Sequence, residues 1–456
     1  MFDNRPESLR AHPLGEVVVG AAEAALSAVD PVRAVSTQVR VEDGILCIGE
    51  QRLPLSEINR IRVVGAGKAG ARMAHALYRV LGERIEGGVV AVHVRVESPH
   101  RTGNIKIVEA DHPVPDLSSV HAAQSVLRAV NGLASEDLVI VLISGGASSL
   151  LTLPADGLCL EDIRTTTDCL LRSGADIGEV NAVRRHLSAI KGGRLAEAAA
   201  PARVISLILS DVVGDAPDAV GSGPTAPDPS TFSDALRVVE RFDLSRQLPV
   251  SVTDRLRRGA VGSVPETPKP GSSIFSRVEN RIIGGNRSAV AAAAAFLASK
   301  GILAAADAKP LTGEARQAAT SVVKKIQQVV RESPPTETVG LVFGGETVVT
   351  VRGSGLGGRN QELALAAVQA AAEIPGVILM TLATDGRDGP SDAAGAVVTD
   401  ATLSRARMLG MTPAEFLDRN DSYHFFACLD DLIIIGPTHT NAADLLLVVI
   451  PPQTEF

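Results

Sequence analysis

Five short apolar runs in the first half of the chain constrain its fold more than any other feature. They are "IRVVGAG", "GGVVAVHV", "NIKIVEA", "DLVIVLIS" and "RVISLILSD", and most of them alternate with stretches of helical character. Strands that alternate with helices are typical of β-α-β units, whose strands lie parallel in one sheet. The sequence therefore predicts an α/β fold in which ligands bind at the carboxyl ends of the strands.

Two local patterns precede these runs. Apolar residues and alanines over residues 14–29 predict a helix, which Pro31 stops. The segments "GILCIGE" and "RLPL" then indicate a small hairpin.

The second half of the chain repeats this style after a segment that is typical of a linker. Residues 259–273, "GAVGSVPETPKPGSS", concentrate Pro, Gly and Ser without apolar periodicity. Beyond them, "VGLVFGG" and "TVVTVRG" are close enough for a hairpin, so we expect a mixed sheet there. We predict two α/β domains, a Rossmann-like parallel-sheet domain over residues 10–260 and a C-terminal domain with a mixed sheet over residues 275–450.

Composition fits this architecture and excludes several classes of function. The 456 residues are 45% hydrophobic, with no Trp and only two Tyr, which suits helices that cover a parallel sheet. The net charge is −8 without a basic block, so we expect no nucleic-acid partner. The charged start "MFDNRPESLR" and the lack of an apolar run of ~18 residues lead us to expect a cytoplasmic protein without a membrane span.

A segment rich in glycine and serine follows the strand predicted at "DLVIVLI". It is "SGGASSLL", residues 144–151, and it leads into a predicted helix. Free N–H groups at a helix start, with hydroxyl groups beside them, make a cradle for an anion. A tight turn that needs two glycines is the alternative. We interpret the segment as a phosphate-binding loop formed by Ser144, Gly145, Gly146, Ser148 and Ser149.

A second glycine-rich segment, "GSGLGGRNQELAL", places Arg359 at an expected helix start. A guanidinium group beside free amides suits a carboxylate or a phosphate. The alternative is a flexible lid, which can also serve catalysis.

Aspartates follow two further predicted strands. Asp211 ends "RVISLILSD" and begins a long loop, and Asp385 and Asp388 lie in "LATDGRDGPSDAAG". Asp211 is a candidate for holding Mg²⁺ or accepting a substrate proton, and Asp385 is a candidate second metal contact. Both are also ordinary turn formers. The nine histidines include no H-E-x-x-H pair, so zinc hydrolysis has no support.

The segment "VVGAGKAG" combines G-x-G-x-x-G spacing with a lysine inside it. The spacing is that of a dinucleotide loop, but the acidic residue expected ~20 positions later is missing, because Glu97 comes too late. A strand end, a helix start and the cation of Lys68 suit any anion equally well. A surface lysine is the alternative, although the helix dipole disfavours a cation at that position.

Taken together, these segments resemble the glycerate 2-kinase family, whose C-terminal part is the MOFRL domain. The resemblance covers residues from about 14 to 450. It rests on motifs in the family's order: "GAGKAG", "HPVPD", "SGGASSL", "HLSAIKGGRLA", "SDVVGDAPDAVGSGPT", "GGETVVTV", "GGRNQE", "ATDGRDGPSDAAGA", "NDSYHFF" and "GPTHTNAADL". The resemblance implies ATP-dependent phosphorylation of D-glycerate at its C2 hydroxyl, with both substrates meeting in the cleft between two domains.

The resemblance also implies roles for single residues. Lys68, Asp211 and Arg359 match the active-site trio, with the two cations on the glycerate carboxylate and the transferring phosphoryl group and Asp211 on the hydroxyl or Mg²⁺. Which cation does which is left open. Lys191 of "KGGRLA" joins residues 144–149 as a nucleotide contact, and ATP and Mg²⁺ are the implied cofactors.

Two other functions stay in view. An NAD(P)-dependent hydroxypyruvate reductase acts on a related three-carbon acid, but the missing ribose-binding acid counts against it. A regulator that binds sugar phosphates would explain the anion loops, but no DNA-binding module is evident. The oligomeric state is left open, a homo-oligomer included.

Overall fold

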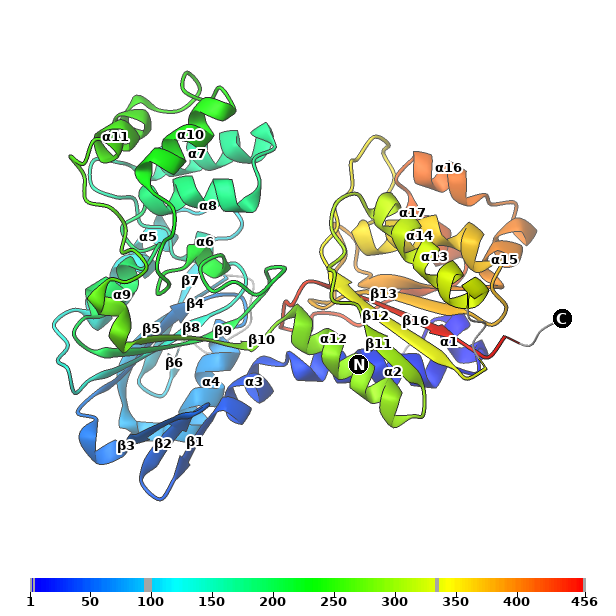
Figure 1. Cartoon of the computed structure of the whole chain (residues 1–456), viewed down its shortest axis with the longest axis horizontal. Coiled ribbons are helices and arrows are strands. Elements are labelled where there is room, and N and C mark those ends of the chain that lie inside the picture. Colours follow the sequence, from blue (N-terminus) through cyan, green and yellow to red (C-terminus); the bar gives the residue numbers. More distant parts are fainter. Residues whose placement is uncertain (1, 3–4, 94–100, 333–335, 454–456) are drawn as a thin grey trace. The chain divides into compact units, whose positions relative to one another are not determined.

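The computed structural model describes residues 2, 5–93, 101–332 and 336–453, so Glu97 lies outside the described residues. The chain divides into two compact units. The large unit is Pro31–Ile283, and the split unit joins Met1–Asp30 to Gly284–Phe456 (Figure 1). None of the described helices is long and apolar enough to cross a membrane.

A seven-stranded sheet forms the centre of the large unit, in the order β10-β9-β8-β4-β5-β7-β6. Five neighbouring strands, β9 to β7, run parallel, which confirms the parallel sheet predicted from the apolar runs, and β6 pairs antiparallel with β7. The strands are β4 (Ile61–Ala66), β5 (Ile85–His93), β6 (Arg101–Thr102), β7 (Ile105–Ala110), β8 (Leu138–Ile143), β9 (Arg203–Leu209) and β10 (Val278–Gly284).

Helices cover this sheet and form a second layer beyond it. α5 packs on the sheet through the apolar face that it buries, against strands β4, β5 and β7. A separate apolar core joins α7, α8, α10 and α11, which lie together at the top of the large unit in Figure 1. The helices are α3 (Pro31–Gln38), α4 (Gly70–Leu81), α5 (Leu117–Val130), α6 (Ala147–Leu150), α7 (Leu160–Ser173), α8 (Ile177–His186), α9 (Arg194–Ala199), α10 (Phe232–Arg241) and α11 (Val250–Ala260).

A small antiparallel sheet precedes β4 in the large unit. The hairpin expected at "GILCIGE" and "RLPL" is confirmed as β2 (Ile45–Ile48) paired with β3 (Gln51–Pro54), and β1 (Val39–Glu42) adds a third strand.

The split unit contains a mixed six-stranded sheet in the order β11-β12-β16-β13-β14-β15. Only β11 and β12 are parallel, because β16, the last strand of the chain, enters antiparallel between β12 and β13. The strands are β11 (Leu303–Ala306), β12 (Val339–Gly345), β13 (Ile378–Ala383), β14 (Gly395–Thr399), β15 (Leu432–Ile433) and β16 (Asp444–Ile450).

The mixed sheet is therefore confirmed, but the expected hairpin is wrong. Residues 347–351 form no strand beside β12, and the side chains of Val348 and Val351 are mostly exposed. Both edges of β12 are taken by β11 and β16, so no edge is left for the following segment. Strand order is set by long-range pairing, which local alternation of residues does not report.

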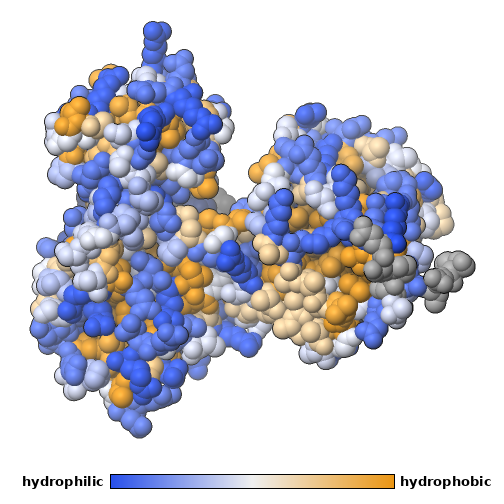
Figure 2. All heavy atoms as spheres, viewed as in Figure 1, coloured by the Kyte–Doolittle hydropathy of each residue, from blue (hydrophilic) through white to orange (hydrophobic). Residues whose placement is uncertain are grey.

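Helices cover both faces of the mixed sheet. α13 and α14 pack on one face, and α2 and α12 lie along the other (Figure 1). Figure 2 shows mostly polar residues on the viewed face of the unit, with a pale apolar area over α12, whose alanines alternate between buried and exposed positions. The helices are α1 (Glu7–Ala11), α2 (Gly15–Ala28), α12 (Asn286–Ser299), α13 (Ala315–Glu332), α14 (Arg359–Ala371), α15 (Thr402–Met408), α16 (Pro413–Asp418) and α17 (Ser422–Cys428).

The two units do not divide where the linker pattern predicts. The helix expected over residues 14–29 forms as α2, but it belongs to the split unit, because Gly20 lets the ring of Phe296 on α12 approach closely. The presumed linker belongs to the large unit, where the Thr267 hydroxyl donates to buried Asp228. Close packing between residues far apart in the sequence, not local Pro and Gly content, decides these boundaries.

Candidate active site

The glycines of "VVGAGKAG" are required by the packing of β4 on β8. Gly65 and Gly67 have φ angles of 153° and 143°, which favour glycine. A Cβ atom at Gly65 would lie 1.9 Å from the Leu142 carbonyl oxygen, and one at Gly67 would lie 2.0 Å from the Ser144 hydroxyl. Two of the three glycines are thus explained without a dinucleotide, which weakens the hydride-transfer interpretation.

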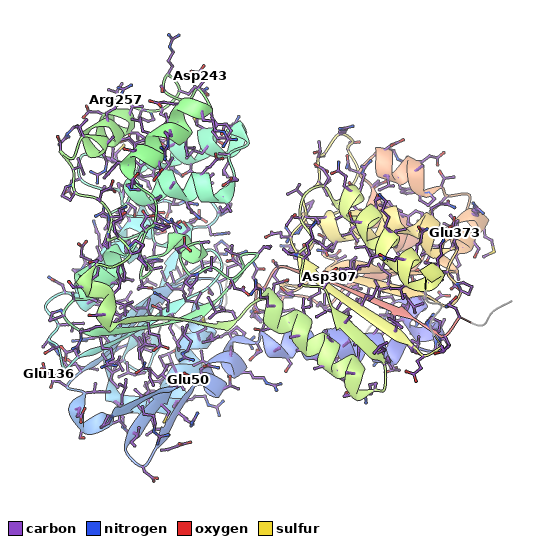
Figure 3. The ribbon with its side chains drawn as sticks, viewed as in Figure 1. Glu50, Glu136, Asp243, Arg257, Asp307 and Glu373 are labelled. Carbon is purple, nitrogen blue, oxygen red and sulfur yellow. The ribbon has the colours of Figure 1, made fainter. Side chains whose placement is uncertain are left out.

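The same packing ties the lysine turn to the serine-glycine loop. The Lys68 N–H donates to the Gly145 carbonyl oxygen at 2.9 Å, and the Ala69 N–H donates to the Ser144 hydroxyl at 3.1 Å. Both turns follow neighbouring parallel strands, so they meet at one edge of the sheet. The labelled residue Glu136 precedes β8 at the opposite edge, as Figures 1 and 3 show.

Lys68 and Asp211 lie together at this edge. The Asp211 carboxyl packs against Gly145, where a Cβ atom would lie 2.5 Å from Oδ2. Burial raises the pKa of Asp211, and the charge of Lys68 partly offsets that effect. Lys68 itself makes no ion pair within the described part of the chain. A lysine that forms no direct ion pair, close to a carboxyl of raised pKa, suits an anionic ligand and a proton transfer.

His112 is a site residue to which the sequence analysis assigned no role. A Cβ atom at Gly146 would lie 3.2 Å from its Nε2 atom and 3.5 Å from Lys68 Cγ, so the three residues share one spot. Burial lowers the pKa of His112 to about 4, and the charges of Lys68 and His93 contribute. The imidazole is therefore neutral at pH 7. The available signal was its position in "HPVPD", two residues after β7 ends.

The serine-glycine loop continues into α6, whose hydroxyls already have protein partners. Gly146 has a φ of 85° at the helix start. The Ser148 hydroxyl lies 2.9 Å from the Ser222 hydroxyl, and the Ser149 hydroxyl donates to the Pro113 carbonyl oxygen. The loop is thus held from both sides, and its contact with a nucleotide stays a prediction.

Lys191 holds the far end of α6. Its ammonium group donates to the carbonyl oxygens of Ser148 at 2.5 Å and Leu151 at 2.9 Å. Burial lowers the pKa of Lys191 well below its usual range, and the charge of Arg184 adds to this. The structure thus gives Lys191 a positioning role on the loop, and its direct contact with nucleotide phosphates stays a prediction.

Arg359 belongs to the split unit and begins α14. Its Nε and Nη2 atoms donate to the two carboxylate oxygens of Asp444, and its Nη1 atom lies 3.0 Å from Glu346. Burial acts to lower the pKa of Arg359, but the hydrogen bonds from Arg359 to Asp444 and the surrounding carboxylates outweigh it and raise the pKa. The planar fork is therefore occupied within the protein. The sequence analysis did not single out Asp444, which precedes the apolar run of β16.

Asp388 and Asp385 lie near this arginine. Asp388 accepts the backbone N–H groups of Asn360 and Gln361, so it caps α14, and burial raises its pKa to about 6. Asp385 accepts the N–H of Arg387 and is partly exposed. Among the described residues, no group of three or more His, Cys, Asp or Glu side chains could hold a metal ion. The proposed metal ligands Asp211 and Asp385 belong to different units.

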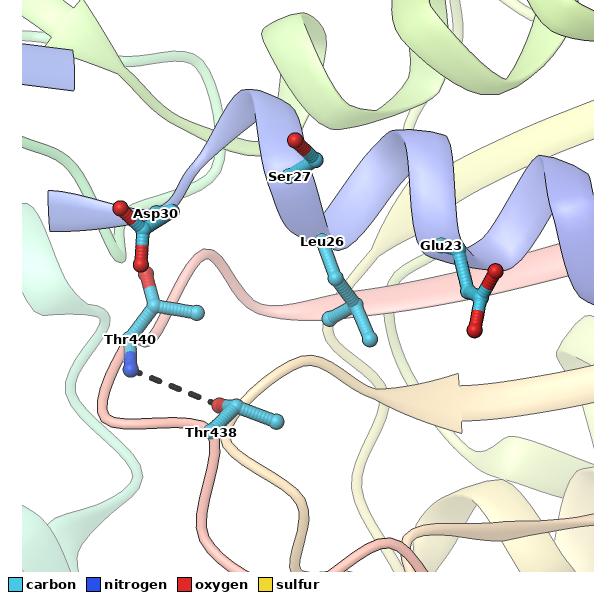
Figure 4. A pocket seen from close by; sticks show the side chains of 6 residues that line it. All are labelled: Glu23, Leu26, Ser27, Asp30, Thr438 and Thr440. Atoms are coloured by element: carbon cyan, nitrogen blue, oxygen red, sulfur yellow. Dashed lines mark hydrogen bonds between the residues drawn. The ribbon is translucent and has the colours of Figure 1, made fainter. Parts of the chain in front are cut away.

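The split unit also has a hollow of about 300 Å³ beside α2, which Figure 4 shows. Thr438 and Thr440 line it, and the Thr440 N–H donates to the Thr438 hydroxyl at 3.4 Å. The carboxylates of Glu23, on α2, and Asp30, just after α2, also line it, and Figure 4 shows Asp30 next to Thr440. Its described lining contains no cation, so it does not suit a phosphate.

Comparisons with known proteins match the whole chain. A family described as a domain of unknown function, DUF4147, matches residues 17–257, and the MOFRL family matches residues 339–444. The D-glycerate 2-kinase of Thermotoga maritima is 40% identical over 99% of this chain and 100% of its own length. The glycerate 2-kinase of Pyrococcus horikoshii is 37% identical over 93% of this chain and 95% of its own.

The chain belongs to the glycerate 2-kinase family. The crystal structure of glycerate kinase from Thermotoga maritima matches this fold with a TM-score of 0.84 at 40% identity, over 98% of this chain and 100% of that one. The resemblance drawn from the motifs is thereby confirmed. A relative from Agrobacterium vitis, 41% identical over 86% of this chain and 100% of its own, has a provisional hydroxypyruvate reductase name.

Proposed function

We propose that the protein is an ATP-dependent D-glycerate 2-kinase, which converts D-glycerate to 2-phosphoglycerate. The observation that carries the proposal is the arrangement of Lys68, Asp211 and the serine-glycine loop at one edge of the parallel sheet, in a chain similar over its full length to glycerate 2-kinases. Strand ends of a parallel sheet are where α/β enzymes bind their ligands.

Lys68 is the proposed cation for the reacting anions. It stands at a strand-to-helix turn and has no ion-pair partner among the described residues, so its charge is available to a phosphoryl group or a carboxylate. Preorganised charge of this kind stabilises the transition state of phosphoryl transfer. The neutral His112 beside it provides a hydrogen bond without adding a second positive charge.

Asp211 is the proposed proton acceptor. In the transfer, the C2 hydroxyl oxygen of D-glycerate forms a bond to the γ-phosphorus of ATP, and the bond from that phosphorus to the β,γ-bridging oxygen breaks. The hydroxyl proton passes to the Asp211 carboxylate, and ADP leaves. Burial raises the pKa of Asp211 toward the working pH, which favours proton uptake in the transition state.

Mg²⁺ is proposed as the ion that accompanies the nucleotide. Proteins usually bind it through one or two carboxylates plus substrate phosphates. Holding this ion is the alternative role of Asp211 to that of proton acceptor. The ion would supply neutralisation of phosphate charge. We propose, from the motif match, that Arg359 binds a substrate anion. It would exchange its ion pair with Glu346 for that anion. We also propose a cytoplasmic location and leave the oligomeric state open.

A coupled assay tests the reaction. Purified protein is incubated with ATP, Mg²⁺ and D-glycerate, and the product is detected with enolase, which accepts 2-phosphoglycerate directly. We expect a signal without added phosphoglycerate mutase. A signal that needs the mutase would show 3-phosphoglycerate and contradict the position of transfer. Oxidation of NADH or NADPH that depends on hydroxypyruvate would favour the reductase instead.

A further inference from the structure

Two adjacent arginines on α8 have opposite surroundings. Arg185 is buried and pairs with two carboxylates, Asp218 and Asp228, each at 3.0 Å. The side chain of Arg184 makes no hydrogen bond or ion pair to any residue that the structure describes, and its Nε atom is fully enclosed without an acceptor. Burial lowers the pKa of Arg184 to about 10. A guanidinium group that is partly enclosed without an acceptor lowers the stability of the folded protein unless an anion binds to it.

Arg184 lines a small cavity together with Lys191, the buried lysine at the far end of α6. The cavity has a volume of about 30 Å³ for the centres of bound atoms. Four hydroxyl-bearing residues complete its polar lining, and none of the described lining residues is a carboxylate. These four are Ser149, Thr152, Thr167 and Ser188.

Two basic side chains and no carboxylate among the described residues make a lining that suits an anion. Burial lowers the pKa of Lys191, and the charge of Arg184 lowers it further, because positive charges on the two groups would repel each other in the cavity. A bound anion would replace that repulsion with attraction to both groups. The four lining hydroxyls already donate to backbone carbonyl oxygens, so the hydrogen-bond donors for a ligand come from the guanidinium fork of Arg184. Such a fork fits the oxygens of a tetrahedral phosphate.

We propose that the cavity lined by Arg184 and Lys191 is an anion site that takes a phosphate group. The cavity borders α6 at Ser149, and the other end of this four-residue helix, at Gly146, contacts Lys68 and His112. The phosphate belongs either to the nucleotide, in which case this site rests on the proposed function, or to a free phosphate that binds independently of catalysis.

Thermal unfolding with inorganic phosphate as the probe tests the site. We expect phosphate to raise the Tm of the wild-type protein more than chloride at equal ionic strength. Arg184→Met should weaken phosphate binding about tenfold, the usual worth of a charged hydrogen bond. Without phosphate, its Tm should equal or exceed that of the wild type, because an unpaired and partly buried cation has been removed. Arg172→Met, which removes an exposed charge on α7, is the matched control and should keep the full phosphate effect.

Several results would overturn the site. One is a wild-type Tm that phosphate does not raise, and another is an Arg184→Met variant that is less stable without phosphate yet keeps the full response. A third is a response lost in Lys68→Met but kept in Arg184→Met, because phosphate would then bind at the lysine turn.

Nucleotide binding distinguishes the two sources of the phosphate, and either source supports the site. Weaker ADP and ATP binding in Arg184→Met assigns it to the nucleotide. Unchanged nucleotide binding with lost phosphate binding assigns it to a free anion. The kinase assay is separate, because an inactive wild type that still binds phosphate through Arg184 would contradict only the proposed function.

Discussion

Lys68 in the large unit and Arg359 in the split unit both follow glycine-containing segments near the start of a helix, but their charges are handled differently. Lys68 forms no ion pair with any described residue, and Arg184 and Lys191 in the same unit form none either. Arg359 has all three nitrogens on the carboxylates of Asp444 and Glu346.

This difference shows that a glycine-rich segment with a cation does not by itself define an anion site. The large unit leaves positive charge available at the carboxyl edge of its parallel sheet. The split unit surrounds its arginine with acids, so an anion has to displace one of them before it can bind. Glu346 is half exposed and Asp444 is buried, so Glu346 is the partner that can leave.

The largest expected effect is the loss of turnover in Lys68→Met, which tests the available positive charge of the large unit. We expect turnover to fall about 10²- to 10³-fold, the usual cost of one preorganised charge at a reacting anion. Stability should change by no more than about 0.5 kcal/mol, because the lysine holds no partner in place. Steady-state kinetics and chemical denaturation measure the two quantities. Arg79→Met, on the exposed face of α4, is the control, and equal turnover in both variants would make Lys68 a bystander.

Asp444→Asn tests whether Asp444 holds Arg359 in the split unit. Removing the buried partner leaves the guanidinium with only the half-exposed carboxylate of Glu346, so we expect a loss of about 3 kcal/mol in the free energy of unfolding. Glu346→Gln removes the half-exposed partner and should cost less than about 1 kcal/mol. Urea denaturation of both variants gives the comparison. If the two substitutions cost the same, Asp444 is not the anchor of Arg359.

The raised pKa of Asp388 predicts that the stability of the split unit depends on pH. Burial raises its pKa to about 6, above the value of 3.8 in the unfolded chain. Between these values the folded state binds more protons, so the contribution of Asp388 to stability falls as the pH rises from about 4 to 6. We expect Asp388→Asn to cost about 1 to 3 kcal/mol more at pH 4 than at pH 7. An equal cost at the two pH values would contradict the raised pKa.

The smallest expected effect is electrostatic and links Lys68 to His112. Burial is the main cause of the low pKa of His112, and the positive charge of Lys68 is the second. Lys68→Met should therefore raise this pKa above about 4 but leave it below the usual 6.5. NMR titration of the imidazole measures it, with Arg79→Met as the control. An unchanged pKa would mean that the two side chains are farther apart than the structure places them.

Part of the candidate site follows from the sequence because of one geometric rule. Lys68, Ser144 and Asp211 each follow an apolar run, and the carboxyl ends of neighbouring parallel strands meet at one edge of a sheet. Their proximity could be predicted without knowing any distance. The surroundings of Arg359 could not be predicted in this way, because Asp444 is 85 positions away and joins it only through the antiparallel entry of β16.

The amino-acid sequence by itself determined the α/β class, the parallel sheet, the helix over residues 14–29 and the family, because each depends on local periodicity or on motifs in order. Only the tertiary structure decided which unit that helix joins, which partner each buried cation has, and why Gly65 and Gly67 are glycines. These properties depend on close contacts between residues far apart in the chain. A buried lysine and an exposed lysine have the same letter in the sequence, and only the packing of the chain determines how far each is exposed to water and which groups it contacts.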